Sequence, residues 1–221
     1  MNVLFRRLAD NTNAGSMASG MRRRRLAVFE TLLSGLPGPV RMLDVGGTES
    51  FWKMTGIPAD ERVRVTLLNM EHPEVTLPRF TGVEGDARRM SSFRDGEFDV
   101  VFSNSVLEHV GGPGDRRAMA DEVRRVGKRY FLQTPNRHFP VEPHFLFPFF
   151  QYLPVGSRAF LLEHFNLGWY GKTGNRDEAR RIVGGIELVG RMELKSLFPE
   201  AVWHDEKVLG LTKSFTVYHG W

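Results

Sequence analysis

The stretch from residue 40 to residue 50, V-R-M-L-D-V-G-G-T-E-S, constrains the fold more than any other part of the chain. An apolar run that carries Asp44 leads directly into two glycines, Gly46 and Gly47. Such a run predicts a buried parallel strand, and glycine lets the following loop approach a ligand because it has no Cβ. In open α/β sheets, ligands bind beyond the carboxyl ends of the strands. We therefore expect a ligand to lie against Gly46 and Gly47.

Strand and helix patterns alternate along the rest of the chain. We expect strands at 41–45, 63–68, 83–86, 98–103 and 129–133, and helices at 21–36, 51–55, 115–126, 176–183 and 187–197. Two further alternating segments, 201–209 and 212–218, flank Gly210 and predict a hairpin. This order predicts an α/β protein with a doubly wound, mostly parallel seven-stranded sheet that is covered on both faces. The C-terminal hairpin adds the antiparallel part of the sheet.

Length and composition favour one domain in an ordinary globular protein. The chain has 221 residues, no cysteine and no apolar run near the roughly 18 residues of a membrane span. Disulfides, thiolate metal sites and cysteine nucleophiles are therefore excluded. We expect residues 1–20 to be a flexible segment and 21–221 a single domain, with a Phe- and Pro-rich insertion at about 136–170 after the fifth strand. With no signal-peptide pattern, a cytoplasmic location is the simplest interpretation.

Four arginines, Arg22 to Arg25, concentrate part of the net charge of +4. They could contact phosphate, nucleic acid or an anionic membrane. They could equally form the solvated face of a helix, since Leu26, Phe29 and Leu33 continue the run at helical spacing. We favour the helix, because no aromatic residue is interleaved with the arginines as a single-strand binding surface requires.

Four motifs at the ends of the predicted strands carry a family resemblance. They are Asp44-Val45-Gly46-Gly47, Asn69 with Glu71, Gly85-Asp86-Ala87, and the string F-D-V-V-F-S-N-S-V-L-E-H-V at 98–110. In this order they resemble the class I S-adenosylmethionine-dependent methyltransferases, in particular the type 11 branch. The resemblance covers most of the chain and implies a Rossmann-like fold.

The resemblance also implies S-adenosylmethionine as the cofactor and assigns its binding residues. The methionine end and the ribose would approach Gly46, Gly47 and Thr48, with Asp44 complementing the ammonium group. The ribose hydroxyls would contact Asn69 or Glu71, and the sequence leaves both open. The remaining assignments are Asp86 and Ala87 for adenine, and Asn104 for the methionine moiety and the sulfonium.

A nicotinamide cofactor is the competing interpretation of the glycine loop. It requires G-x-G-x-x-G at the start of a helix, where a pyrophosphate binds. Here the loop reads G-G-T-E-S-F, and the carboxylate of Glu49 would repel a diphosphate. We therefore favour S-adenosylmethionine.

Three histidines are candidates for catalysis: His109, His138 and His144. Methyl transfer needs a general base only when the acceptor must lose a proton. His109 could be that base or could brace the loop. Zinc and iron are commonly bound by side chains of the kind found at His138, Glu142 and His144. These side chains could instead line the acceptor pocket, or they could form hydrogen bonds within a Pro-stiffened loop. We expect no metal here.

The acceptor is less constrained by the sequence than the cofactor. The aromatic residues of the insertion could form an acceptor pocket, a surface for a dimer or membrane, or a core. We favour a small-molecule acceptor methylated on oxygen or carbon, because the Asn/Asp-Pro-Pro-aromatic motif of N-methylating enzymes is absent after the fourth strand. Methylation of RNA or protein, and binding of S-adenosylmethionine without transfer, remain alternatives. Nucleic acid is the less favoured partner, and a homodimer is compatible with the sequence.

Overall fold

The structure is a computed structural model, and it describes residues 15–221. Most of the expected flexible segment, residues 1–14, therefore lies outside the described residues. Helix α2 spans Met17–Ser34 and so begins four residues earlier than expected. Its start is fixed by Ser16, whose side chain accepts a hydrogen bond from the backbone N–H of Ser19 at 3.0 Å.

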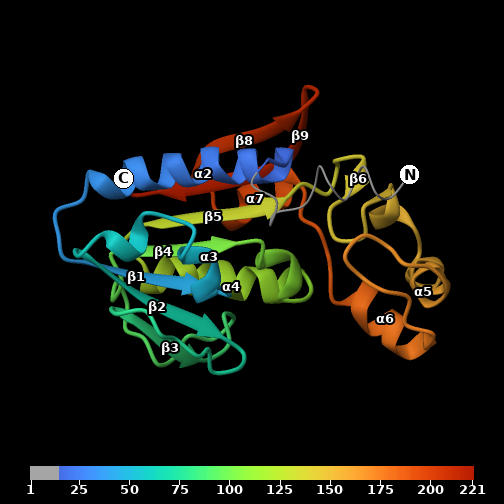
Figure 1. Cartoon of the computed structure of the whole chain (residues 1–221), viewed down its shortest axis with the longest axis horizontal. Coiled ribbons are helices and arrows are strands. Elements are labelled where there is room, and N and C mark those ends of the chain that lie inside the picture. The colour runs from blue at the N-terminus through green and yellow to red at the C-terminus, as the bar shows by residue number, and fades with distance from the viewer. Residues whose placement is uncertain (1–14) are drawn as a thin grey trace.

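A seven-stranded sheet forms the centre of the molecule, in the order β3-β2-β1-β4-β5-β9-β8 (Figure 1). Its strands are β1 Val40–Val45, β2 Val63–Asn69, β3 Phe80–Glu84, β4 Val100–Asn104, β5 Tyr130–Pro135, β8 Val202–Val208 and β9 Leu211–His219. The first five pair in parallel, and β9 pairs antiparallel with both β5 and β8. The predicted fold class is confirmed. The strand order reverses beside β1, which is where α/β sheets bind ligands.

Helices cover both faces of this sheet, as the alternating pattern predicts. One apolar cluster packs α4 (Pro113–Val126) and α7 (Arg191–Leu197) against the sheet through Met119, Val123 and Leu194. The other packs α2 and the short helix α3 (Glu49–Trp52) through Phe29 and Trp52. Within residues 15–221, no helix combines the length and apolarity needed to cross a bilayer.

Several boundaries differ from the prediction by a few residues, and three of these differences bear on the site or its neighbours. The second helix is α3, and it starts at Glu49 rather than Phe51 because Thr48 caps it. The last helix, α7, starts at Arg191 rather than at residue 187. The third strand is β3, which ends at Glu84, so Asp86 lies in the loop beyond it. Two 3-10 turns, η1 (Ile57–Ala59) and η2 (Leu107–His109), complete the sheet domain.

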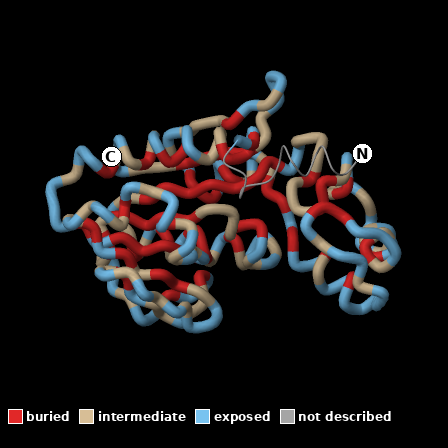
Figure 2. The backbone as a smooth tube through the Cα atoms, viewed as in Figure 1, coloured by how far each residue is buried: buried red, intermediate tan, exposed pale blue. Residues whose placement is uncertain are grey.

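The insertion after β5 is longer than predicted and folds around a core of its own (Figure 2). A bridge between Asn136 and Val189 closes it, so it runs on through α6 instead of ending near residue 170. It lies to one side of the sheet (Figure 1) and contains β6 Val141–Glu142, β7 Phe147–Pro148, η3 Phe150–Tyr152, α5 Val155–His164 and α6 Arg176–Gly184.

The aromatic residues of the insertion divide into two groups. Phe145 and Phe150 are buried in its core, and their rings pack in a tilted arrangement with centroids 4.3 Å apart. Phe149, Phe160 and Trp169 are about half exposed. The core interpretation is therefore correct for the first group.

Candidate active site

A cavity of about 850 Å³ opens at the carboxyl ends of β1, β2 and β3. The residues expected to hold the cofactor supply much of its wall: Gly46, Gly47, Thr48, Asn69, Glu71, Asp86 and Ala87. Because the carboxyl ends of parallel strands share one edge, side chains that are far apart in sequence meet here. Asp44 and Asn104 lie elsewhere, as described below.

The glycine loop is shaped so that side chains are excluded at both glycines. Gly46 has a φ of +74°, and a Cβ there would lie 2.4 Å from a methyl of Val106. A Cβ on Gly47 would lie 1.5 Å from a carboxylate oxygen of Asp44. The backbone of the loop therefore forms the cavity wall, and Gly47 tolerates no side chain.

Asp44 supports the loop from behind and is not part of the described cavity lining. It is 1% exposed, and the indole N–H of Trp52 donates to its Oδ2 at 2.6 Å. Burial raises the pKa of Asp44 to about 8, although the hydrogen bond from Trp52 opposes this. Asp44 thus lies behind Gly47, and its interaction with an ammonium group, directly or through water, stays a prediction.

The end of β2 separates the two residues proposed for the ribose. The side-chain amide of Asn69 donates to the carbonyl oxygen of Gly47 at 2.9 Å, so it fixes the glycine loop. Glu71 is exposed along the cavity wall. The amide of Asn69 is thus engaged by the loop, whereas Glu71 lines the cavity as an exposed residue.

The loop after β3 contains an ion pair that sequence reasoning missed. Arg88 donates to both carboxylate oxygens of Asp86, at 3.0 and 2.7 Å, and lies 3.2 Å from an oxygen of Asp115. Its hydrogen bonds lower the pKa of Asp86. Asp86 is therefore a paired anion at the cavity wall. The spacing D-A-R is a local signal from which this pair could have been predicted.

Glu49 has a structural role that the sequence did not reveal. Its carboxylate accepts hydrogen bonds from the backbone N–H and hydroxyl of Thr76 and from the N–H of Leu77, and it pairs with Lys53 at 2.5 Å. The Lys53 contact, with these bonds, lowers the pKa of Glu49 to about 2. Glu49 thus holds the loop at 70–77, whose residues 70–74 line the cavity.

Asn104, at the end of β4, lies in a second and smaller cavity of about 120 Å³. Its side-chain oxygen is buried and has no hydrogen-bond partner within residues 15–221. Ser105 lines both cavities, and its φ of +57° is unusual for a residue with a side chain. Its hydroxyl bonds to Gln133 at 2.8 Å. Ser105, which the sequence analysis missed, is the link between the two cavities.

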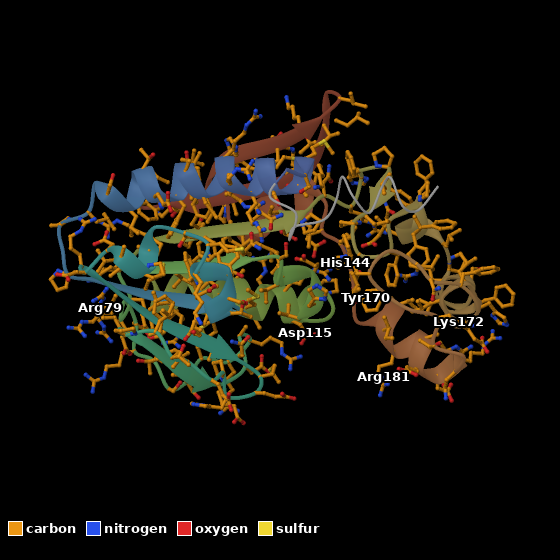
Figure 3. The ribbon with its side chains drawn as sticks, viewed as in Figure 1. Arg79, Asp115, His144, Tyr170, Lys172 and Arg181 are labelled. Atoms are coloured by element: carbon orange, nitrogen blue, oxygen red, sulfur yellow. The ribbon has the colours of Figure 1, made fainter. Side chains whose placement is uncertain are left out.

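The predicted catalytic histidines do not all come together. His109 lines the large cavity, and its ring lies 4.9 Å from that of His144, centroid to centroid and at right angles. His144 lies where the insertion meets the sheet domain (Figure 3). His138 instead contacts the hydroxyl of Tyr152 at 3.1 Å, away from the cavity lining of the described chain. The structure thus brings His109 and His144 together and places His138 beside Tyr152 instead.

The two neighbouring histidines differ in their electrostatics. His109 is exposed to the cavity, and the partial loss of solvent around its ring, with the charge of His144, lowers its pKa to about 4. Burial would also lower the pKa of His144. However, its Nδ1 lies 2.7 Å from Glu142 Oε1, and the two carboxylates of Glu142 and Glu108 raise that pKa overall. His109 is therefore neutral at pH 7.

Comparison with known proteins agrees with this geometry. Residues 44–130 match the model of a family described as a methyltransferase domain. That segment contains the glycine loop and the string around His109, and it runs from β1 to β5. Residues 44–130 therefore carry a methyltransferase domain, and its sheet has the fold of the S-adenosylmethionine-dependent methyltransferases. S-adenosylmethionine is the cofactor of that family.

Solved structures of methyltransferases share the fold. One is an S-adenosylmethionine-dependent methyltransferase from Methanosarcina mazei, with a TM-score of 0.52, 14% identity, and coverage of 85% of this methyltransferase and 95% of that chain. Another is the CurJ carbon methyltransferase, with a TM-score of 0.54, 12% identity, and coverage of 97% and 65%. The carbon methyltransferase domain of the citrinin polyketide synthase has a TM-score of 0.53, 13% identity, and coverage of 91% and 52%.

Two curated proteins of Mycobacterium tuberculosis strains, the uncharacterized proteins MT1557 and Rv1509, are also similar. Each is 42% identical to this methyltransferase over 53 residues. That match covers 24% of this chain and 18% of each relative.

Proposed function

We propose that this chain transfers a methyl group from S-adenosylmethionine to a small-molecule acceptor, on oxygen or carbon. The observation that carries the proposal is the cavity at the carboxyl ends of β1, β2 and β3, walled by the Gly46-Gly47 backbone. A volume of about 850 Å³ is within the range of small-molecule and cofactor sites.

In this proposal the cofactor follows the order of the strands. Its methionine end lies against Gly46, Gly47 and Thr48, and its ribose against Glu71. Its adenine lies near Ala87, whose wall position is apolar and buried. Asp86 would contact the adenine amino group only with the oxygen positions that Arg88 leaves open.

The acceptor would approach from the side of His109 and Ser105. Methyl transfer is an in-line displacement, so the enzyme mainly aligns the nucleophile with the methyl carbon and excludes water. His109 is neutral at pH 7 and can accept a hydrogen bond, but its pKa of about 4 makes it a weak general base. Positioning is therefore its main role in this proposal.

Transfer is tested by incubating the purified protein with S-adenosylmethionine labelled on the methyl group and a small-molecule extract. We expect label in an acceptor together with an equal amount of S-adenosylhomocysteine. Cofactor binding without either product would instead support a fold relative that binds S-adenosylmethionine and transfers nothing. Label in RNA or protein, with steeply salt-dependent RNA binding, would support the macromolecular alternative.

The proposal also includes a cellular location and an oligomeric state. A cytoplasmic location is expected from the cysteine-free composition, and a homodimer is compatible with the half-exposed aromatic residues of the insertion. Size-exclusion chromatography with light scattering measures whether the protein is a homodimer.

A further inference from the structure

Three side chains of metal-binding type meet at one end of the large cavity. Glu108 and His109 come from η2, directly after β4, and His144 comes from the insertion. One ligand atom from each lies within 4.8 Å of the others. Two imidazoles and one carboxylate form a donor set that suits zinc or non-haem iron. The pair Glu142 and His138, considered with His144 from the sequence, is not part of this set.

Each histidine already uses one ring nitrogen on a second partner. His144 Nδ1 is hydrogen-bonded to Glu142 Oε1 at 2.7 Å, which leaves Nε2 for a ligand bond. His109 is hydrogen-bonded to the backbone of Gly185. Ligating histidines in metal sites are typically oriented by a carboxylate or carbonyl in this way.

Glu142 is itself held rigidly. It is 2% exposed, and its Oε2 accepts from the backbone N–H groups of His144 and Phe145 at 2.8 and 2.7 Å. The rotamer of Glu142, and through it the ring of His144, is therefore set before any ligand binds.

Glu108 supplies the observation that points to a cation. It is fully buried, at 0% exposure, and its Oε2 accepts from the hydroxyl of Thr134 at 2.9 Å. Its Oε1 is buried and has no hydrogen-bond partner within residues 15–221. Burying a carboxylate oxygen without a partner is costly. A cation between Glu108 and the two histidines would remove that cost.

We propose that Glu108, His109 and His144 bind one divalent transition-metal ion of the zinc type. Bond lengths of about 2.0 Å place ligand atoms in a tetrahedral site roughly 3.3 Å apart, so rotations of Glu108 and His109 toward the fixed ring of His144 would close the present spacing. Because His109 lines the large cavity, the fourth coordination position opens into it. That is the arrangement of a catalytic zinc site, in which three protein ligands leave one place for water or substrate.

The role of the ion in catalysis rests on the proposed methyl transfer, whereas its binding does not. An acceptor hydroxyl in the open position would have its pKa lowered and would release its proton to water. Its oxygen would then form the bond to the methyl carbon as the carbon–sulfur bond breaks. The electron pair stays on sulfur and gives S-adenosylhomocysteine.

Binding is tested by titrating the metal-free, full-length protein with zinc chloride alone in a calorimeter. We expect one ion per chain, and a loss in affinity of about 100-fold or more in Glu108→Gln and in His144→Ala. Glu142→Gln should weaken binding by roughly 10- to 100-fold, since it orients a ligand without touching the ion. His138→Ala is the matched control and should bind zinc as the wild type does. Circular dichroism verifies that each variant is folded.

Two results would overturn the binding site: no zinc binding by the wild type, or equal binding by the wild type and both ligand variants. Either would leave the cluster a purely structural one, in which His144 pairs with Glu142 and Glu108 accepts from Thr134. Failure of methyl transfer with zinc still bound would reject the proposed function and leave the site intact. An unchanged transfer rate after complete metal removal would reject the role of the ion in the reaction.

Discussion

At the scale of single residues, Asp44 is the side chain whose surroundings most alter its chemistry. It is buried behind Gly47, and burial raises its pKa to about 8 from the ordinary value of 3.8. Between these two values the folded protein holds a proton that the unfolded chain has released. Stability from this group is therefore lost as pH rises, by up to about 1.4 kcal/mol per pH unit.

The variant Asp44→Asn removes this titration but keeps an acceptor for the Trp52 indole. We expect the free energy of unfolding of the variant, relative to wild type, to rise by up to about 3 kcal/mol between pH 5 and pH 7. Urea denaturation of both proteins at the two pH values measures it. A difference that does not change with pH would show that Asp44 is ionised in the folded protein.

Asn69 is the second residue whose role the structure redefines. Its amide holds the carbonyl of Gly47 at 2.9 Å, so we expect Asn69→Ala to loosen the glycine loop. One hydrogen bond of about 0.5–1.5 kcal/mol corresponds to a roughly 2- to 12-fold weaker affinity for S-adenosylmethionine. Calorimetry on the variant measures this, and a loss of 100-fold or more would instead indicate direct contact with the cofactor.

At the scale of elements, Glu49 connects the start of α3 to the loop at 70–77. Replacing it by glutamine removes the charge that accepts from Thr76 and Leu77. We expect hydrogen exchange at these two amides to become about 10-fold faster or more, since hydrogen bonds to charged groups contribute roughly 1.5–3 kcal/mol. Glu74→Gln, an exposed carboxylate on the same loop, is the control and should leave both amides unchanged.

A buried ion pair connects α2 to β8 and corrects the interpretation of the arginine cluster. Arg25 is 7% exposed, and one of its terminal nitrogens lies 3.0 Å from each carboxylate oxygen of Glu206. The cluster is therefore not simply a solvated face, because one of its members is an internal residue of the fold.

Removing one partner of this pair leaves the other charge buried. We expect Arg25→Met to lower the free energy of unfolding by about 3–5 kcal/mol, and the double variant Arg25→Met/Glu206→Gln to recover most of that loss. Denaturant titrations of the two variants measure both values. Equal destabilisation of the single and double variants would mean that lost packing, not the unpaired charge, is responsible.

At the scale of the whole molecule, the sheet and its ligand edge could be predicted because their signals are local. An apolar run followed by Gly46 and Gly47 identifies a strand and a ligand loop without knowledge of any neighbour. The same reasoning predicts the place of three polar residues in the cavity wall, since each ends or follows a strand: Asn69, Glu71 and Asp86.

The features of the site that the sequence does not predict depend on contacts between segments that are distant in the chain. The sequence does not reveal that Asn104 faces a second cavity, that Glu49 reaches Thr76, or that His109 meets His144. The extent of the insertion depends on such contacts too, because α6 completes its core and the polar helical pattern of α6 resembles that of any surface helix.

In the proposed function, the backbone at Gly46 and Gly47 forms the site for S-adenosylmethionine. Calorimetric titration of S-adenosylmethionine into wild type, Gly47→Val and Gly156→Ala measures whether it does. A Cβ at Gly47 would meet Asp44 at 1.5 Å, whereas at Gly156 nothing lies within 4 Å. We predict binding by wild type and Gly156→Ala, and at least about 100-fold weaker binding by Gly47→Val, which corresponds to about 2.7 kcal/mol. Equal binding by all three folded proteins would contradict the account.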